Sequence, residues 1–403
     1  MLPEREVEIV GNKKLLSIIE NFEEELISLF HDFHKHPELS NEEFQTTEKI
    51  KKLLGDVDIE ILDLPLKTGL VAEIKGNPNG PVVAIRCDID ALPIIEETDL
   101  EYKSVDEGKM HACGHDFHIV VVLGAAYIIK KFHTSLIGTV KFIFQPGEES
   151  GDGAQKILET GALDDVDVMF GIHNISDYKV GVMGVKEGAM TAAVDRFEIK
   201  ITGIGSHAAK PEKSVDPIII ATNIINSLQT IISRNVSPTD KALLSVTHME
   251  SGNTWNVIPE NAYIEGTVRT LDESTREFIH ERMNSIIQGI SMSYGGKAEL
   301  IWHSGAPATK NSKNWTKFAS KLGEVMGYDV RNISMGLEGE DFAYYQKKIP
   351  GAFIVVGTGI SEAHHHPAYQ VDERSILKCS KYFAKLAEGA LKEIVENNYL
   401  VRK

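Results

Sequence analysis

Three short apolar runs, each followed at once by polar residues, constrain the fold of this chain more than any other feature. They cover residues 81–86, 138–144 and 167–172, and each is typical of a buried strand. A long apolar helical segment lies between the first two of them. Open α/β sheets are built from such strands and keep their sites at the carboxyl ends of the strands. The pattern therefore predicts an α/β domain whose functional residues follow the runs.

Acids and a histidine stand at the ends of these three runs. Asp88 and Asp90 come directly after the first run. Glu148 and Glu149 follow the second, and His173 ends the third. Adjacent acids can have different tasks, one binding a metal ion while its neighbour moves protons. Each position alone is also compatible with a capped or solvated turn, but the repetition at three strand ends favours a site.

The stretch from His111 to Asp116 packs a thiol, two imidazoles and a carboxylate into six residues. Gly114 lets the backbone turn so that Cys113 and His115 can face one point. A thiolate and an imidazole at that spacing can bind one transition metal ion, at about 2.3 and 2.0 Å. The alternative is a loop with a buried cysteine and a solvated histidine. Asp116 could instead cap the apolar helix that follows it.

Helical spacing of apolar residues predicts helices over residues 24–36, 40–54 and 117–132. The second has Ser40 at its start and Glu43 three residues later, which together predict a capping box. The first contains histidines without acidic or thiol neighbours in the sequence, and these are expected to be solvated. They are His31, His34 and His36.

The pattern changes between about residues 187 and 303, where strands with one exposed face alternate with helices. Strand, helix, strand, strand, helix, strand is the predicted order, which is enough for a small α+β domain. The expected strands include residues 193–202, 242–249 and 262–269, and the expected helices are residues 216–233 and 274–293. Buried strands and helices return after this region.

Charge and cysteine content limit the partners and the compartment. The chain of 403 residues has a formal net charge of −17, which argues against nucleic acid and anionic membrane surfaces as partners. Three cysteines far apart imply no disulfide framework, so a reducing compartment and a cytoplasmic location are expected. The first residues lack the apolar core of a signal peptide, and the apolar runs fall short of the roughly 20 residues of a membrane span.

The motifs described above occur in a fixed order together with several further ones. They are residues 86–93, 111–116, 144–149, 205–209, 256–259, 266–269, 339–342 and 365–367. In this order the motifs resemble the co-catalytic metal-dependent amidohydrolases, which include aminoacylases, hippurate hydrolases and plant indole-acetyl-amino-acid hydrolases. Carboxypeptidase G-type enzymes are more distant relatives. The resemblance extends from about residue 25 to residue 385.

The resemblance implies an α/β catalytic domain with a mostly parallel central sheet, interrupted by a smaller α+β domain that serves as a lid and forms a homodimer. The catalytic domain would comprise residues 1–186 and 304–403, and the lid residues 187–303. Two divalent metal ions are also implied. One thiolate, imidazoles and a carboxylate suit zinc, manganese, cobalt or nickel as ligands.

Carried over to this chain, the resemblance implies a metal-binding and a catalytic set in the catalytic domain. The metal ligands would be Cys113, His115, Glu149, His173 and His365, with His366 as the alternative to His365. Glu148 would be the general acid and base. Asp90 would orient the ligands, with Asp88 beside it.

Three lid residues would complete the site according to the same resemblance. His207 would stabilise the oxyanion, either in its own subunit or across the dimer. Asn256 and Arg269 would hold the carboxylate of the substrate. Without the resemblance, the sequence favours an ordinary surface histidine for His207 and an arginine in an ordinary ion pair for Arg269.

The reaction implied is hydrolysis of the amide bond of N-acyl-L-amino acids of the N-acetyl, benzoyl or aryl-acetyl type. A deacetylase of N-acetyldiaminopimelate and a dipeptidase or carboxypeptidase are the alternatives within the family. Two other classes compete with a metal hydrolase. One is a cysteine amidase with Cys113 as nucleophile and His115 or His111 as base. The other is a metal-binding scaffold without activity, which would leave Glu148 without a task.

Overall fold

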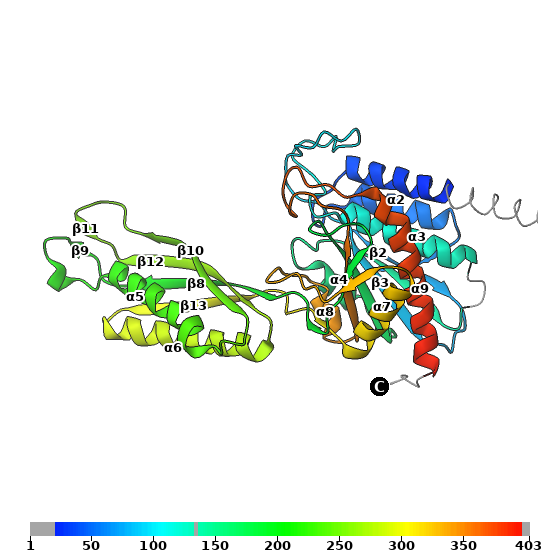
Figure 1. The fold of residues 1–403 in the computed structure, drawn as a ribbon. Coiled ribbons are helices and arrows are strands. Elements are labelled where there is room, and N and C mark those ends of the chain that lie inside the picture. Colours follow the sequence, from blue (N-terminus) through cyan, green and yellow to red (C-terminus); the bar gives the residue numbers. More distant parts are fainter. Residues whose placement is uncertain (1–20, 133–135, 397–403) are drawn as a thin grey trace, which may run out of the picture. The chain divides into compact units, whose positions relative to one another are not determined.

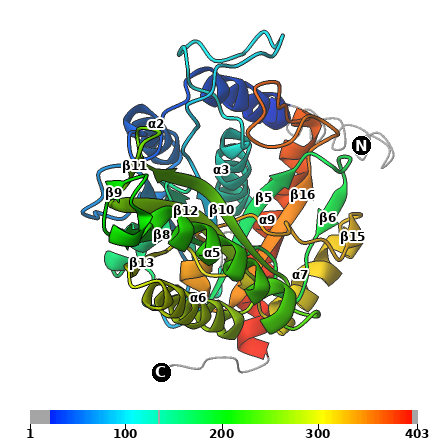
Figure 2. The same ribbon diagram turned by 90° about the vertical axis from the view of Figure 1, so that its left-hand side faces the viewer.

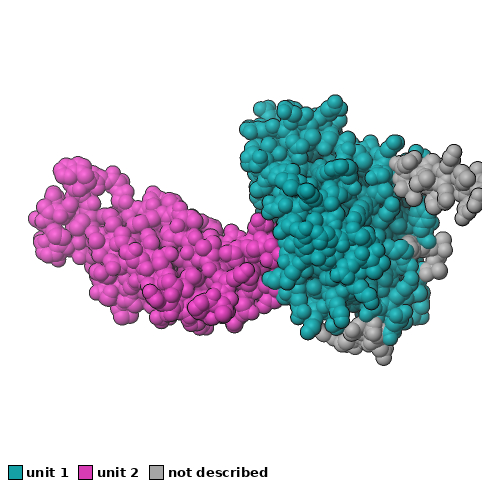
Figure 3. Space-filling model, viewed as in Figure 1, with its two compact units in different colours: residues 1–188, 311–333, 344–403 teal, residues 189–310, 334–343 magenta. Residues whose placement is uncertain are grey.

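The computed structural model describes residues 21–132 and 136–396. The chain divides into two compact units, coloured separately in Figure 3. Unit 1 comprises the described residues up to Gly188, then Asn311–Ile333, and those from Tyr344 onward. Unit 2 comprises Ala189–Lys310 and Ser334–Ala343. The segment 334–343, which the sequence predicted to belong with the catalytic domain, therefore groups with unit 2.

Unit 1 is built on a sheet whose described strands follow the order β1-β2-β4-β3-β5-β16-β6-β15. The central strands β4, β3, β5 and β16 are parallel, while β2 and β6 run antiparallel to their central neighbours. Figure 2 shows β5, β16 and β6 side by side. The strands are β1 (Glu60–Ile61), β2 (Leu70–Lys75), β3 (Val82–Asp88), β4 (Thr139–Gln145), β5 (Val168–Ile175), β6 (Val182–Gly184), β15 (Asp329–Arg331) and β16 (Gly351–Gly357).

Helices pack on this sheet, and Figure 1 shows their arrangement. α3 (His115–Phe132) and α9 (Ile376–Glu396) lie against each other and against β3. Their close approach requires a glycine at position 124, because a Cβ there would lie 2.4 Å from Ser380 Oγ. The other helices of unit 1 are residues 21–35, α2 (Phe44–Gly55), α4 (Gly153–Glu159), α7 (Lys313–Val325), α8 (Ala343–Gln346, which begins at the unit boundary) and the 3₁₀ turn η3 (Glu373–Ser375).

Unit 2 has a four-stranded antiparallel sheet in the order β10-β12-β8-β13, with alternating buried and exposed residues in β8 and β12. Its two longer helices share a hydrophobic core with one face of that sheet. The elements are β8 (Ala193–Thr202), β9 (Ser206–His207), η1 (Pro211–Lys213), α5 (Pro217–Thr230), the π turn η2 (Ile231–Asn235), β10 (Ala242–Ser251), β11 (Val257–Ile258), β12 (Asn261–Thr270), α6 (Glu273–Ser293) and β13 (Lys297–Ser304). The short strands β7 (Gly188–Ala189) and β14 (Lys310–Asn311) lie where the chain passes between the units.

The α/β class with a mainly parallel central sheet is confirmed, and so is the predicted strand and helix order of unit 2. The predicted capping box is wrong. α2 begins at Phe44, and the Glu38 carboxylate caps its first turn by accepting from the backbone N–H groups of Gln45 and Thr46. Ser40 instead donates to Asp90, and Glu43 accepts from the backbone of Asn41 and Gly147. Ser40 and Glu43 are therefore engaged elsewhere, and Glu38 caps the helix in their place.

Two boundary predictions also need correction. Asp88 and His173 lie inside β3 and β5 and do not follow them, because each strand continues its pairing with its neighbours. The sequence also predicts a final helix over residues 373–398. It begins as a 3₁₀ turn, and its last two predicted residues lie outside the described part of the chain. Within the described residues, no helix is long and apolar enough to span a membrane.

Candidate metal centre

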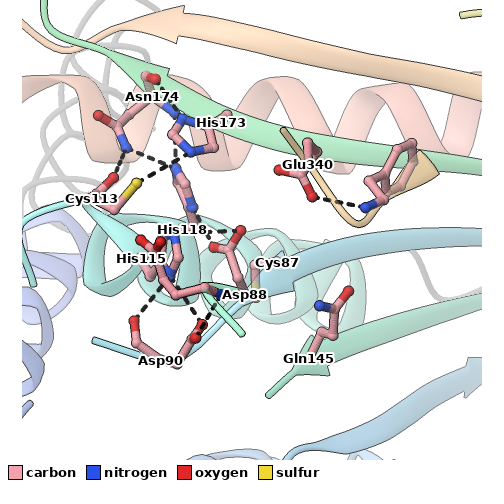
Figure 4. A network of polar contacts seen from close by, with 12 residues as sticks. Cys87, Asp88, Asp90, Cys113, His115, His118, Gln145, His173, Asn174 and Glu340 are labelled. Atoms are coloured by element: carbon pink, nitrogen blue, oxygen red, sulfur yellow. Dashed lines mark hydrogen bonds and ion pairs between the residues drawn. The ribbon is translucent and has the colours of Figure 1, made fainter. Parts of the chain in front are cut away.

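The candidate site lies at the carboxyl edge of the parallel strands of unit 1. Asp88 of β3 is in register with Gln145 of β4. Further along the sheet, His173 of β5 is in register with Val355 of β16. Figure 4 shows the side chains from β3, β5 and the start of α3 pointing toward one another. Segments that are distant in sequence therefore converge here.

Two overlapping groups of ligand-type side chains form the centre. Cys113, His115 and His173 make the first group. Cys113, Glu149 and His365 make the second, and in each the ligand atoms lie within 4.8 Å of one another. The Cys113 sulfur therefore belongs to both groups.

The distances inside these groups can be compared with those around a bound ion. Cys113 Sγ lies 3.6 Å from His173 Nε2, and Glu149 Oε1 lies 3.2 Å from His365 Nε2. Around one tetrahedral zinc ion, a sulfur and a nitrogen ligand are about 3.5 Å apart, and a nitrogen and an oxygen ligand about 3.3 Å. The side chains therefore fit two divalent metal ions.

Asp90 orients one ligand and the turn that carries another. His115 Nδ1 lies 2.9 Å from the Asp90 carbonyl oxygen and 3.2 Å from its Oδ1, so this nitrogen donates. His115 Nε2 is buried and makes no hydrogen bond to a described residue, which leaves its lone pair for a metal ion. Asp90 Oδ2 accepts from the Glu149 backbone N–H at 3.0 Å. Burial alone would raise the pKa of Asp90, but these hydrogen bonds hold it below its usual range.

Cys113 is better suited to bind a metal ion than to act as a nucleophile. Its side chain is buried, and burial together with the Glu149 carboxylate raises the pKa of the thiol well above its usual range. A thiol in such surroundings is a poor nucleophile. A divalent cation would stabilise the thiolate in the same place. The geometry therefore disfavours the cysteine amidase.

Glu148 and Glu149 lie in the turn after β4, and their side chains have different neighbours. Glu149 approaches His365, as described above. Glu148 belongs to neither group that contains Cys113, but its oxygen lies within 4.8 Å of ligand atoms of His115 and Glu149. The turn is held by Gly147, whose N–H donates to Glu43 Oε1 at 2.8 Å. Glu148 is thus placed beside the centre without being needed as a ligand.

His365 and His366 are separated by their contacts. His365 adopts a φ of 65°, and its ring reaches Glu149. The Nδ1 of His366 accepts from the backbone N–H of Ala368 at 3.1 Å, within its own turn. Of the two, His365 is therefore the one that shares the centre, and its half-exposed side chain leaves that side of the centre open to solvent.

Sequence reasoning missed a fully buried polar network beside the ligands, of which Figure 4 shows Asp88, His118 and Asn174. Arg86 donates to Asp88 Oδ2 at 2.8 Å, and His118 Nδ1 donates to Asp88 Oδ1 at 2.5 Å. His118 Nε2 then accepts from the backbone N–H of Asn174 at 2.9 Å. Burial alone would raise the pKa of Asp88, but His115, His118 and Arg86 hold it well below its usual range. Asp88 therefore supports the ligands as a charged carboxylate.

The prediction that the histidines of the first helix are solvated is wrong for His34. Its side chain is buried between two carboxylates, with Nδ1 at 2.6 Å from Asp116 and Nε2 at 3.2 Å from Glu96. Burial alone would lower the pKa of His34, but these hydrogen bonds raise it to about 9. Asp116 lies in the first turn of α3 and is engaged with His34 and the backbone of Phe117, so it is not an N-cap.

The raised pKa of His34 predicts how stability depends on pH. In the unfolded chain the pKa of His34 is near 6.5. The contribution of His34 to the free energy of unfolding is therefore complete below that pH and is lost as the pH rises through about 9, its pKa in the folded protein. A shift of this size corresponds to about 3 kcal/mol in the free energy of unfolding. Denaturant unfolding of metal-free protein between pH 6 and 10 should show this loss in the wild type, and His34→Gln should lack it. Parallel curves for the two proteins would contradict the assignment.

In unit 2, His207 and Asn256 lie close together. His207 is exposed in β9, whose partner β11 follows Asn256 directly, and the Asn256 carbonyl accepts from Ala208 N–H at 3.1 Å. At one end of the four-stranded sheet, Thr202 of β8 pairs with Asn261 of β12. His207 and Asn256 both lie beyond this end.

Arg269 lies toward the opposite end of β12. From Asn261 to Arg269 the strand extends about 25 Å, so one copy of unit 2 does not bring Asn256 and Arg269 to one carboxylate. The half-buried guanidinium of Arg269 makes no ion pair within the described residues, because Arg276 takes both oxygens of the nearby Asp195. A free cation in this position is suited to bind an anion.

Comparisons with known proteins agree with this centre. Residues 84–389 match the peptidase family M20/M25/M40. An N-acetylcysteine deacetylase of Bacillus subtilis (strain 168) is 48% identical over 374 residues, covering 93% of this chain and 98% of the relative. Thermostable carboxypeptidase 1 of Saccharolobus solfataricus is 35% identical, covering 90% of this chain and 94% of the relative.

A solved structure of similar sequence supports the same conclusion. It is a Bacillus subtilis protein described as a dinuclear metal-binding peptidase from the M20 family, with 45% identity and a TM-score of 0.84. The match covers 93% of this chain and 99% of that one. The resemblance inferred from the motifs is therefore confirmed. The chain belongs to peptidase family M20/M25/M40 and is a metal-dependent amidohydrolase.

Proposed function

We propose that the protein hydrolyses the amide bond of N-acyl-L-amino acids, with N-acetyl amino acids as its first substrates. One observation carries this proposal: two ligand groups share Cys113, and beside them lies Glu148, which belongs to neither. Similarity to two deacetylases of N-acetylcysteine, at 48% and 45% identity, favours an acetyl group and a small side chain.

The chemistry divides between the metal ions and the side chains. When bound, the two divalent ions polarise the amide carbonyl and make water acidic enough to lose a proton near neutral pH. Glu148 takes that proton and delivers it to the leaving amine. Asp90 keeps His115 in the tautomer that leaves Nε2 unprotonated. Arg269 binds the carboxylate of the substrate, and His207 donates a hydrogen bond to the oxyanion.

The substrate class is tested by a hydrolysis screen on metal-free protein reloaded with manganese or zinc. N-acetyl-L-cysteine and N-acetyl-L-alanine are expected to be cleaved faster than benzoyl and indole-acetyl amino acids. N-acetyldiaminopimelate and dipeptides test the alternatives within the family. Faster cleavage of a dipeptide than of every N-acyl amino acid would replace the proposal, and no hydrolysis of any amide would refute it.

A homodimer completes the proposed site. The separation of Asn256 and Arg269 along unit 2 supports a site that takes Arg269 from one subunit and His207 with Asn256 from the partner. The three buried cysteines, all free, are compatible with the proposed cytoplasmic location.

Subunit mixing is expected to restore activity between two inactive variants. Glu148→Gln and His207→Ala are each expected to lack activity. When they are unfolded together and refolded in equal amounts, the mixed dimer has one site with both residues intact, so about a quarter of wild-type activity should return. The measurement is the initial rate of N-acetyl-L-cysteine hydrolysis. If the rate of the mixture does not exceed the sum of the separate rates, His207 does not act across the dimer.

A further inference from the structure

Asn174 is a fully buried side chain that the reaction does not use directly. It follows His173 in β5 and is 0% exposed. It is the neighbour in sequence of His173, which belongs to the first ligand group. Its hydrogen bonds extend to the loop of Cys113, to α3 and to the loop that carries His365. Figure 4 shows the first two of these contacts.

The donors of Asn174 reach the loop of Cys113 and the helix α3. Nδ2 donates to the carbonyl oxygen of Cys113 at 2.5 Å. The backbone N–H donates to His118 Nε2 at 2.9 Å, and Nδ2 also lies 3.0 Å from that nitrogen. His118 is fixed on its other side by Asp88, so β5, α3 and β3 are joined through Asn174.

The acceptor of Asn174 reaches the loop that carries His365. Oδ1 accepts from the hydroxyl of Tyr369 and from His364 Nε2, the latter at 3.1 Å. Between these two residues, His365 is in the left-handed region with a φ of 65°, a conformation that costs free energy for a residue with a side chain. The backbone N–H of His365 donates to the Ala112 carbonyl at 2.9 Å, which draws this loop onto the loop of Cys113.

Gly114 shows how closely Asn174 is packed. A Cβ at position 114 would lie 2.4 Å from Asn174 Nδ2 and 2.9 Å from the hydroxyl of Tyr369. The φ of Gly114 is 81°, which also favours glycine. The turn between Cys113 and His115 is therefore shaped around the Asn174 amide.

We propose that Asn174 is a positioning residue that sets the relative geometry of three ligand-bearing segments: the loop of Cys113, the end of β5 with His173, and the loop of His365. The inference rests on the metal centre proposed above. By fixing these segments before a metal ion binds, Asn174 lowers the cost of arranging the ligands. Residues of this kind raise metal affinity without touching the metal.

The chain offers a matched control in Asn311. It is buried as well, and it makes a similar set of hydrogen bonds: Nδ2 to the Phe353 carbonyl at 2.9 Å, and Oδ1 from Phe353 N–H at 2.6 Å and Gln346 at 3.1 Å. None of these partners belongs to a ligand group that contains Cys113. A merely structural asparagine should behave like Asn311.

The test compares metal binding in Asn174→Ala and Asn311→Ala. Titration of the metal-free proteins with Mn²⁺ or Zn²⁺ gives the dissociation constants, and thermal unfolding of the same metal-free samples gives their stability. Asn174→Ala is expected to bind metal about 10- to 100-fold more weakly than wild type. Asn311→Ala is expected to lose thermal stability to a similar extent but to bind metal as wild type does.

Tyr369→Phe provides a milder variant should Asn174→Ala fail to fold. It removes one hydroxyl hydrogen bond to Oδ1, and we expect a several-fold loss of metal affinity. Wild-type metal affinity in Asn174→Ala would overturn the inference. If only Tyr369→Phe folds, wild-type metal affinity in that variant would overturn it. An equal loss of metal affinity in Asn311→Ala would overturn it as well. Absence of metal binding in the wild type would instead refute the metal centre itself.

Discussion

Glu148→Gln is expected to retain both metal ions and to lose hydrolysis by about a thousandfold, the middle of the range for a general acid and base. The substitution keeps the size of the side chain but removes its ability to accept a proton. Because Glu148 lies outside both groups that contain Cys113, the ligands are unaffected. Metal content measured on the purified variant, together with kcat for N-acetyl-L-cysteine, tests both halves of the prediction.

Glu149→Gln is the matched control, because it is the neighbouring residue and carries the same change. Glu149 approaches His365 within the second ligand group, so this variant should lose metal as well as activity. Proton transfer by Glu148 and metal binding by Glu149 are separate roles only if Glu148→Gln keeps the wild-type metal content but is inactive, while Glu149→Gln has a reduced metal content. Metal loss in Glu148→Gln, or activity within tenfold of wild type, would contradict the proposed division.

The strand ends of unit 1 could be predicted from the sequence because their signals are local. An apolar run predicts a buried strand, and the residues after it fall at one edge of a parallel sheet. Asp90 and Glu149 lie after β3 and β4 as expected, while Asp88 and His173 lie within β3 and β5, because these strands end at Asp88 and Ile175 and not at residues 86 and 172. The boundary was missed because pairing with the neighbouring strand, not local composition, decides where a strand stops.

The supporting residues could not be predicted, because their partners are distant in sequence. His34 finds Asp116 at a separation of 82 residues, and Asn174 finds Tyr369 at a separation of 195. Nothing adjacent to either residue distinguishes it from a solvated side chain. Arg86 gave a usable signal, because it is a charged residue inside a run that is predicted to be a buried strand. Such a residue requires an internal partner, and Asp88 provides it.

Cys113→Ser is expected to weaken the binding of both metal ions by on the order of 100-fold or more, since losing a ligand costs at least as much as losing its supporting partner. The sulfur belongs to the group with His115 and His173 and to the group with Glu149 and His365. A serine hydroxyl at the same place is a far weaker ligand, because it does not ionise near neutral pH. Titration of metal-free protein, with the bound metal counted per chain, measures the effect.

His365→Gln distinguishes a shared ligand from one that serves a single ion. His365 belongs only to the second group that contains Cys113, so its loss should weaken one metal ion and leave the other at wild-type affinity. A chain that keeps one tightly bound ion in His365→Gln and none in Cys113→Ser would place the sulfur between the two ions. If Cys113→Ser also keeps one ion, the sulfur serves one group only, and if it keeps both, Cys113 is not a ligand.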